Sequence, residues 1–220
     1  MGSGSFGSVY KAEWNGGPVA VKILHEKLFT SRNEYLAQFE AECKILQNLQ
    51  HKNVVTLLEF IISHTSPPML ITELLDCDLG KYIANCHPGR IPYSETLSIM
   101  LDVAEGLAYL HQQNPPIVHR DLASKNILLT KEKQAKIADV GQSASKRRKK
   151  LLFSCTRNAS LCCTRDVSPR LFSKFSHFKG STRVEYDTKL DIFSLGITLM
   201  EVITGRLPSS QPCIPFTSGT

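Results

Sequence analysis

The polar octapeptide from His119 to Asn126 is the stretch of this sequence best suited to chemistry. The Asp121 carboxylate can accept a proton from an attacking hydroxyl, and the Asn126 amide oxygen can bind a hard cation such as Mg²⁺. Apolar residues flank the octapeptide at 115–118 and at 127–129, and a charged loop between buried segments is a common place for catalytic groups. A charged turn between two strands is the plain alternative, and five further segments argue against it.

A glycine-rich stretch, G-x-G-x-x-G-x-V, runs from Gly2 to Val9. Glycines let backbone N–H groups approach phosphates closely. Dinucleotide-binding folds share part of this pattern, but there the glycines open a helix. Here residues 8–14 are rich in strand formers, and Asn15-Gly16-Gly17 predicts a tight turn into a second strand, so the glycines are expected in a hairpin. Further strands are expected at 51–60 and 68–75.

Three helices are expected to position these motifs. The first begins at the capping box Ser31-Arg32-Asn33-Glu34 and runs to about Leu49. The second runs from Ser94 to about Gln113, before two prolines. The third ends at Gly205 and is apolar on nearly all sides, which indicates burial all round. The expected buried residues are Leu36, Phe39, Cys43, Leu46 and Leu49 in the first helix, Leu97, Leu101, Ala104, Leu107, Ala108 and Leu110 in the second, and Leu190, Ile192, Phe193, Leu195, Ile197, Leu199, Met200, Val202 and Ile203 in the third.

The composition is that of an ordinary globular chain with one unusual segment. The 220 residues are 42% hydrophobic and 21% charged, enough for one or two domains. Residues 143–184 hold eleven Lys and Arg against the single acid Asp166, so this segment carries +10 and the remainder −4. A basic run is more often a solvated loop than a nucleic-acid patch, so nucleic acid is an unlikely partner and only a minor alternative.

The sequence indicates an intracellular, cytoplasmic location. No apolar run reaches membrane-spanning length, and the N-terminus has no signal-peptide core. The cysteines form no C-x-x-C pair, so neither a zinc site nor a disulfide framework is indicated, and a reducing compartment is the simplest interpretation. The seven cysteines are Cys43, Cys77, Cys86, Cys155, Cys162, Cys163 and Cys213.

Taken in order, these motifs resemble the catalytic domain of eukaryotic protein kinases, in the tyrosine kinase or tyrosine-kinase-like group. Besides the H-R-D-L-x-x-x-N octapeptide and the glycines, the chain has V-A-V-K at 19–22, a hinge-like segment at 70–75 and K-I-A-D-V-G at 136–141. A central-helix sequence follows from Tyr186. The resemblance implies an α+β, two-lobed fold, truncated at both ends. The β-rich lobe with one helix and the hinge would occupy residues 1–75, and a partial, mainly helical lobe 76–220.

The resemblance also implies ATP and Mg²⁺ as cofactors, with in-line transfer of the γ-phosphoryl group to a Ser, Thr or Tyr hydroxyl of a protein substrate. Thr72 would be the gatekeeper, and the backbones of Glu73 and Leu75 would bind adenine. The catalytic residues would be Asp121, Lys22, Glu42, Lys125 and Asn126, with Asn126 and Asp139 as metal ligands. The nucleotide-binding residues would be Gly2, Gly4, Phe6, Gly7, Val9, Ala20, Lys22, Thr72, Glu73, Leu75, Leu128 and Asp139.

Two pairings in this site follow from the resemblance. Lys22 would hold the α- and β-phosphates and pair with a glutamate of the first helix. That glutamate is assigned to Glu42, which lies beside the apolar stripe of the helix. The rival Glu40 lies about 200° away from Glu42 around the helix. Asp191, in the third helix, would accept hydrogen bonds from the backbone of the octapeptide.

Departures from the family pattern favour a second hypothesis, a pseudokinase-like nucleotide-binding or scaffold protein with little activity. Val140 stands where the family has Phe, at an expected cost of about 1–3 kcal/mol of packing. Its expected neighbours are Leu46, Leu57 and His119. No A-P-E follows, Ser168-Pro169-Arg170 being nearest, and the last helices of the larger lobe are not recognised. A third hypothesis is an incomplete version of a longer protein, in which residues 143–184, expected to be disordered, are foreign to the domain.

The sequence is compatible with either Ser/Thr or Tyr as the residue that accepts the phosphoryl group. Ser/Thr kinases usually carry Lys two positions after the catalytic Asp, where this chain has Ala123, and a cation appears instead at Lys125. This arrangement resembles tyrosine kinases and their relatives. The segment that would read the substrate is not recognisable, so both classes of acceptor remain.

Overall fold

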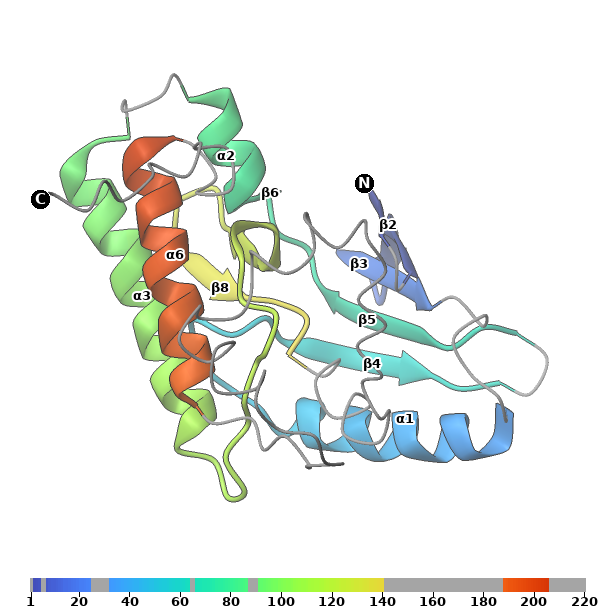
Figure 1. Ribbon diagram of the computed structural model, residues 1–220. Coiled ribbons are helices and arrows are strands. Elements are labelled where there is room, and N and C mark those ends of the chain that lie inside the picture. The colour runs from blue at the N-terminus through green and yellow to red at the C-terminus, as the bar shows by residue number, and fades with distance from the viewer. Residues whose placement is uncertain are drawn as a thin grey trace, which may run out of the picture.

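The computed structural model describes residues 2–4, 7–24, 32–63, 66–86, 91–140 and 188–205. Within these ranges the chain forms a five-stranded and a three-stranded sheet, with helices packed against both (Figure 1). The predicted α+β class is confirmed. The prediction that residues 143–184 are disordered concerns residues outside the described ranges.

The larger sheet carries the glycine-rich hairpin. Its strand order is β1-β2-β3-β5-β4, all antiparallel, and its strands are β1 (Gly2–Gly4), β2 (Gly7–Trp14), β3 (Gly17–Leu24), β4 (Leu57–Ile61) and β5 (Met69–Glu73). The β2–β3 turn has φ of 51° at Asn15 and 78° at Gly16. Positive φ at both central residues is the type I′ geometry that Asn-Gly favours, because its twist matches that of the strands. The predicted hairpin is confirmed.

Gly7 allows the two strands of this hairpin to approach closely. A Cβ added at Gly7 would lie 2.4 Å from the Ile23 carbonyl oxygen and 3.3 Å from the Leu24 Cα, both backbone atoms. We expect Gly7→Ala to lower the free energy of unfolding by about 1–3 kcal/mol, since the backbone must shift to make room. Gly17→Ala is the matched control in the same hairpin, because its Cβ would meet only the Trp14 carbonyl oxygen at 3.9 Å. Equal melting temperatures of the two variants would contradict this expectation.

Helix α1 (Arg32–Gln47) packs on the face of the large sheet that Leu57 occupies. Phe39 and Cys43 form a core cluster with Leu57, and Leu36 is also buried. The predicted stripe is confirmed, with Leu46 half-buried and Leu49 buried just beyond the helix end. The stripe fixes which side of α1 faces the sheet.

The strand predicted for 51–60 is half wrong, because only Leu57–Ile61 forms a strand. Residues 53–55 contact residues 135–137 of the smaller sheet instead. Fully buried Asn53 donates from its side chain to the Ala135 carbonyl and accepts the Ile137 N–H on its own carbonyl, both at 2.9 Å. Val54 forms an isolated parallel bridge with Ile137. These contacts direct the backbone of residues 53–55 to the smaller sheet. The strand predicted for 68–75 is confirmed in its central part, as β5.

Among the described residues after β5, the chain forms a small sheet and three helices. The sheet order is β6-β7-β8. The strands are β6 (Cys77–Asp78), β7 (Ile127–Leu129) and β8 (Ala135–Ile137), and the helices are α2 (Leu79–Asn85), α3 (Tyr93–His111) and α6 (Lys189–Thr204), with a 3₁₀ turn η2 (Ser124–Asn126) before β7. Helices α3 and α6 run side by side (Figure 1).

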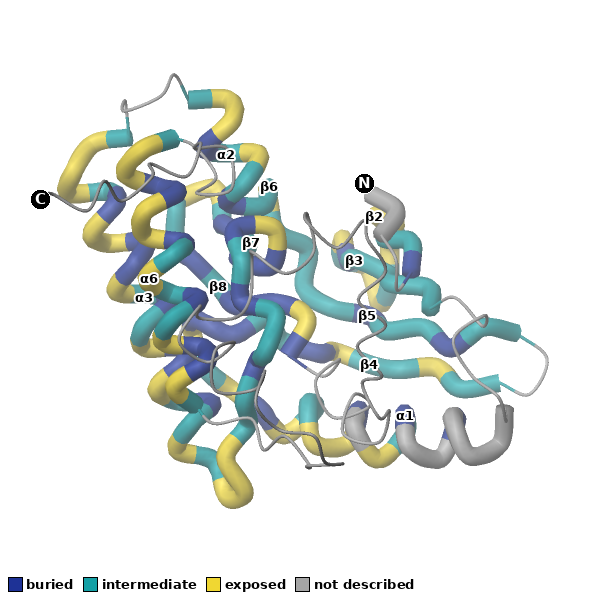
Figure 2. The backbone as a smooth tube through the Cα atoms, in the orientation of Figure 1, coloured by how far each residue is buried: buried dark blue, intermediate teal, exposed yellow. Residues whose placement is uncertain are grey.

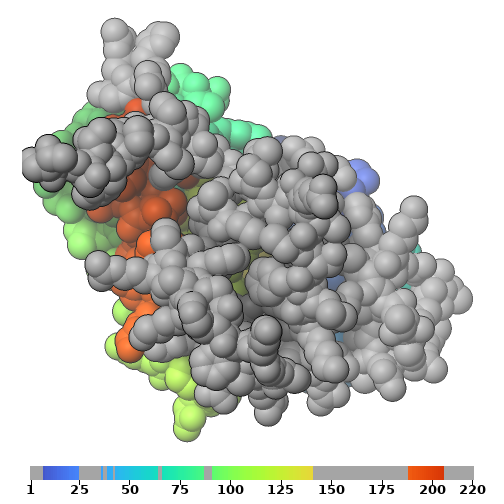
Figure 3. Space-filling view, in the orientation of Figure 1, coloured from blue at the N-terminus to red at the C-terminus, as the bar shows by residue number. Residues whose placement is uncertain are grey.

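The buried faces of α3 and α6 differ from those predicted. In α3 the prediction is confirmed for Leu107 and Leu110, which are buried, but Leu97 and Leu101 are 47% and 54% exposed. Ile99 and Val103, which were not predicted, are buried instead. Both stripes have helical spacing, so periodicity could not choose between them, and the small sheet packs against the second. In α6, the exposed apolar residues are Ile192, Leu199, Met200 and Ile203, so the prediction of burial on all sides is wrong. Figure 2 shows exposed positions along this helix, and Figure 3 shows part of α6 at the surface. Gly205 ends α6 with φ of 64°, as predicted.

Candidate active site

The predicted catalytic segment lies against the first turn of α6. The Asp191 carboxylate, which is 0% exposed, accepts hydrogen bonds from the backbone N–H groups of His119 and Arg120, each at 2.8 Å. The Nε2 atom of His111, on α3, lies 2.8 Å from the same carboxylate. The predicted role of Asp191 is confirmed, and it fixes the start of the octapeptide.

Two residues of the site have left-handed backbone conformations. Arg120 has φ of 69° and Asp139 has φ of 59°, values that cost a residue with a Cβ on the order of 1–3 kcal/mol. Arg120 is held by the hydrogen bond from its N–H to buried Asp191, and Asp139 is held by the ion pair of its side chain with Lys22. Backbone held in this way is typical of functional segments.

Buried His119 connects the octapeptide to the segment that carries Asp139. Its Nδ1 accepts the Asp121 N–H at 3.3 Å, so the ring proton is on Nε2, which donates to the Ala138 carbonyl at 2.8 Å. In return, the Ala138 N–H donates to the Asn126 carbonyl at 2.8 Å. The two predicted metal ligands, Asn126 and Asp139, are therefore held on adjoining segments.

Asp121, Lys125 and Asn126 form one polar group. The Asn126 amide donates to the Asp121 carbonyl at 2.7 Å and to Asp121 Oδ2 at 3.2 Å. The Lys125 ammonium lies 3.3 Å from the same Oδ2. The Asp121 side chain is 28% exposed, so its carboxylate is held by neighbours and still accessible. This is the geometry that a proton acceptor needs.

Lys22 and Asp139, 117 positions apart, are in direct contact. The Lys22 ammonium donates to Asp139 Oδ1 at 2.6 Å, with side-chain exposures of 13% and 37%. Both are predicted nucleotide-binding residues, and the structure brings their side chains together. The predicted Lys22–Glu42 pair stays a prediction, because the Glu42 side chain lies outside the described residues.

The register of the large sheet places four predicted nucleotide-binding residues on one face. Val9 pairs with Lys22, and Ala20 pairs with Thr72. Directly opposed residues share a face, as do residues two apart on one strand. Val9, Ala20, Lys22 and Thr72 therefore form a continuous surface that leads to Asp139. Gly2 and Gly4 lie on β1, opposite Val9 and Gly7, whereas Phe6 lies outside the described residues.

Glu73, in the hinge-like segment, is bound on both its backbone and its side chain. Its N–H donates to the Thr56 carbonyl at 3.2 Å, so for adenine only its carbonyl is a suitable partner. Its carboxylate accepts the Thr56 N–H at 2.8 Å and two hydrogen bonds from the Lys136 ammonium, each at 2.8 Å. The ion pair joins the larger sheet to β8, three residues before Asp139.

The remaining predicted residues have consistent positions. Leu128 lies on β7 opposite Asp78, and the N–H of Asp76 donates to the Leu129 carbonyl at 2.9 Å, so the end of the hinge segment lies beside β7. Half-buried Leu75 lies just before this contact. Val140 is buried in the same core cluster that Leu46 packs against, while Leu57 belongs to the other cluster.

Sequence reasoning missed three side chains that support the site: Lys136, Ser124 and Glu201. Lys136 lies within K-I-A-D-V-G, so its place in the motif was visible, but its partner is 63 positions away. Ser124 lies inside the octapeptide and donates to Glu201 across 77 positions. A buried carboxylate on an apolar helix was the available signal for Glu201, because such a group needs a partner.

A magnesium ion fits the donors present. Asp139 offers a carboxylate and Asn126 an amide oxygen, which are hard ligands of the kind that hold Mg²⁺ together with substrate phosphates. No cluster of three or more His, Cys, Asp or Glu that could bind a metal occurs in the described ranges, so a metal carried entirely by such side chains is not indicated there.

Comparison with known proteins gives a match over most of the chain. A family model described as "Protein tyrosine and serine/threonine kinase" matches residues 1–213. The chain is 35% identical over 214 residues to serine/threonine-protein kinase CTR1 of Arabidopsis thaliana, covering 94% of this chain and 24% of that protein. It is 33% identical over 208 residues to serine/threonine-protein kinase 12 of the same plant, covering 93% and 42%.

A receptor-like relative matches equally well. MDIS1-interacting receptor like kinase 1 of Arabidopsis thaliana is 33% identical over 214 residues, covering 94% of this chain and 20% of that protein. This chain therefore spans less than half the length of each of these curated relatives. Among the helices that the structure describes, none combines the length and apolar character needed to cross a membrane.

Proposed function

Because this chain belongs to the protein tyrosine and serine/threonine kinase family, we propose that it transfers the γ-phosphoryl group of Mg·ATP to a protein hydroxyl. The observation that carries the proposal is the contact of Lys22 with Asp139, beside the Asp121–Asn126 group. Residues from both sheets thus meet at one site. The names of the relatives support Ser or Thr as the acceptor, although Ala123 and Lys125 resemble the tyrosine kinase arrangement.

Each side chain then has a defined task. The Asp121 carboxylate orients the acceptor hydroxyl and takes its proton, while Lys125 beside it offsets negative charge. Lys22 binds the α- and β-phosphates, and the glycine hairpin covers them. Asn126 and Asp139 would hold Mg²⁺, which supplies positive charge next to the transferring group. Thr72 and the backbones of Glu73 and Leu75 border the adenine, with Leu128 on its other side.

The setting proposed is intracellular and cytoplasmic. ATP is abundant there, and the cysteines Cys43, Cys77 and Cys86 are free thiols, which fits a reducing compartment. The partners are ATP and a protein substrate. The domain boundary near residue 75 follows the hinge segment and is part of the same proposal.

Calorimetric titration tests the metal ligands. We expect the chain to bind ATP with Mg²⁺ more tightly than without it, and Asp139→Asn to weaken Mg·ATP binding by about 10–100-fold, because one charged metal contact is lost. Glu105→Gln is the control, since Glu105 is exposed on α3 and pairs with Lys52. Equal ATP affinity with and without Mg²⁺ would sink the proposal.

A second candidate is a nucleotide-binding protein without transfer activity. Val140 at the D-F-G position favours it, since the aromatic ring that the family packs there is absent. This second function predicts that calorimetry detects Mg·ATP binding. It also predicts that Asp121→Asn leaves any measured phosphate transfer unchanged.

A further inference from the structure

The hydroxyl of Ser124 makes a buried contact that is not used in the reaction described above. Ser124 lies three residues after Asp121 and opens the η2 turn, with 7% of its surface exposed. Its Oγ donates a hydrogen bond of 2.9 Å to Oε1 of Glu201, in the last turn of α6, which is 8% exposed. Because both groups are buried, water can replace neither as a hydrogen-bond partner, so the contact fixes the position of the hydroxyl.

Helix α2 restricts this hydroxyl from another side. A Cβ added at Gly80 would lie 3.2 Å from Ser124 Oγ and 3.7 Å from Ser124 Cβ. The side chain of Ser124 thus lies between the first turn of α2 and the last turn of α6. Its position is determined by both helices.

The turn that Ser124 opens carries the catalytic group. The Asn126 N–H donates to the Ala123 carbonyl at 2.8 Å, and the Ile127 N–H donates to the Ser124 carbonyl. Asn126 in turn binds Asp121 through its side chain and Ala138 through its carbonyl. A shift of Ser124 would therefore move Asn126 relative to the carboxylates of Asp121 and Asp139.

We propose that Ser124, held by Glu201, is a positioning residue for phosphoryl transfer. Asp191 and Glu201 lie ten residues apart on α6, about 15 Å along the helix axis. Asp191 fixes the start of the octapeptide and Glu201 fixes its end, so α6 sets the geometry of the segment between them. This inference rests on the proposed function, and it adds a specific determinant of the position of Asp121, Lys125 and Asn126.

Kinetics of four variants and one control variant test it. We expect Ser124→Ala and Glu201→Met each to lower kcat about ten-fold, with KM for ATP within about two-fold, since each removes the hydrogen bond between the two buried side chains. The double variant should lose no more than Glu201→Met alone, because Ser124→Ala removes a contact that Glu201→Met has already removed. Glu201→Gln keeps an acceptor oxygen and should lose less than about three-fold. Thr198→Val is the control, because Thr198 is equally buried on α6 but its hydroxyl donates to the Ser194 carbonyl.

Amide hydrogen exchange reads the same contact without any turnover. We expect Ser124→Ala and Glu201→Met to speed exchange at Asn126, Ile127 and Ala138 by about ten-fold and leave the β2–β3 hairpin unchanged. Unchanged exchange at these amides would overturn the proposal, as would an additive double variant or an unchanged kcat together with a lower melting temperature. Absence of transfer in the wild-type chain would instead refute the proposed function, and exchange would still decide the role of Ser124.

Discussion

Replacing Asp191 with alanine is expected to lower the free energy of unfolding by about 3–5 kcal/mol, the largest stability effect of any single substitution considered for this chain. The carboxylate is fully buried and has three donors, the N–H groups of His119 and Arg120 and the His111 ring. Alanine leaves all three without this acceptor, in a region that is buried at His119 and partly buried at His111 and Arg120, and it also leaves a cavity. The octapeptide would then lose its fixed start.

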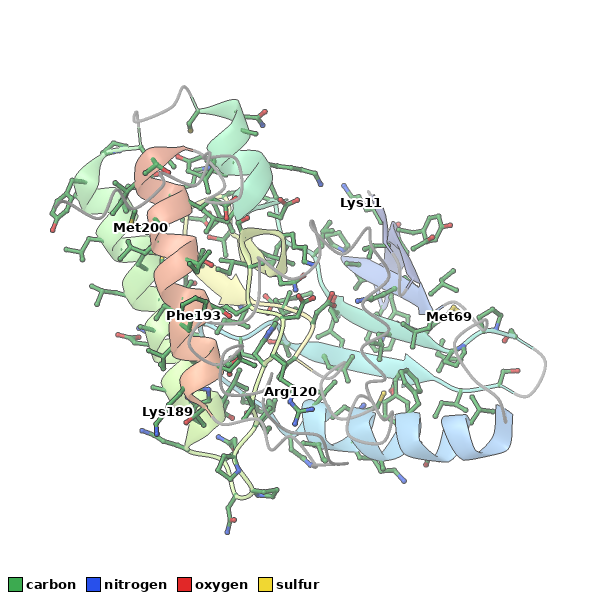
Figure 4. The ribbon with its side chains drawn as sticks, in the orientation of Figure 1. Lys11, Met69, Arg120, Lys189, Phe193 and Met200 are labelled. Carbon is green, nitrogen blue, oxygen red and sulfur yellow. The ribbon has the colours of Figure 1, made fainter. Side chains whose placement is uncertain are left out.

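Urea denaturation followed by far-ultraviolet circular dichroism measures this loss. Met200→Ala is the control, since Met200 is on the same helix, points away from the octapeptide and is 53% exposed (Figure 4). It should cost within about 0.5 kcal/mol, as surface substitutions usually do. If Asp191→Ala and Met200→Ala unfold at the same urea concentration, the buried carboxylate does not organise this part of the fold.

Replacing Asp121 with asparagine is expected to lower the rate of phosphoryl transfer by about 10²–10⁴-fold, the usual contribution of a positioned general base. Asparagine has nearly the same shape, so the bond from the Asn126 amide to the backbone carbonyl of residue 121 is retained. Affinity for Mg·ATP should stay close to that of the wild type, since the lost group acts on the acceptor hydroxyl.

A transfer assay with labelled ATP on a mixed set of Ser, Thr and Tyr peptides tests this prediction and identifies the acceptor. Calorimetry on the same variant separates binding from transfer. Equal labelling by wild type and Asp121→Asn would show that the signal comes from a contaminating kinase, and absence of labelling in both would favour the nucleotide-binding alternative.

The sequence was sufficient for those parts of the site that depend on residue type and short spacing. The Asn15-Gly16 turn, the octapeptide and the Asp191 contact could all be predicted, because each follows from a local pattern or a family motif. The motifs assigned both Lys22 and Asp139 to the nucleotide, but their direct ion pair was not predicted, because the expected partner of Lys22 was Glu42.

Other features could not be predicted because they depend on packing between distant segments. Leu97 and Ile99 belong to two apolar stripes of one helix, and only the neighbouring sheet decides which is buried. The segment before Leu57 has strand-forming residues, yet the side chain of Asn53 binds it to the smaller sheet. Glu201 stands out as a carboxylate on an apolar helix, but Ser124 does not stand out by type, and their pairing across 77 positions appears only in three dimensions.

The ion pair of Glu73 with Lys136 has a mechanical consequence. Along the chain, residues 74–76 connect the two sheets, and this short segment alone would allow the sheets to rotate relative to each other. The two 2.8 Å hydrogen bonds from Lys136 to Glu73 restrain this connection. Any rotation that separates the sheets at this point must first break a partly buried charged contact. Relative motion of the two sheets is therefore expected to be smallest near Glu73.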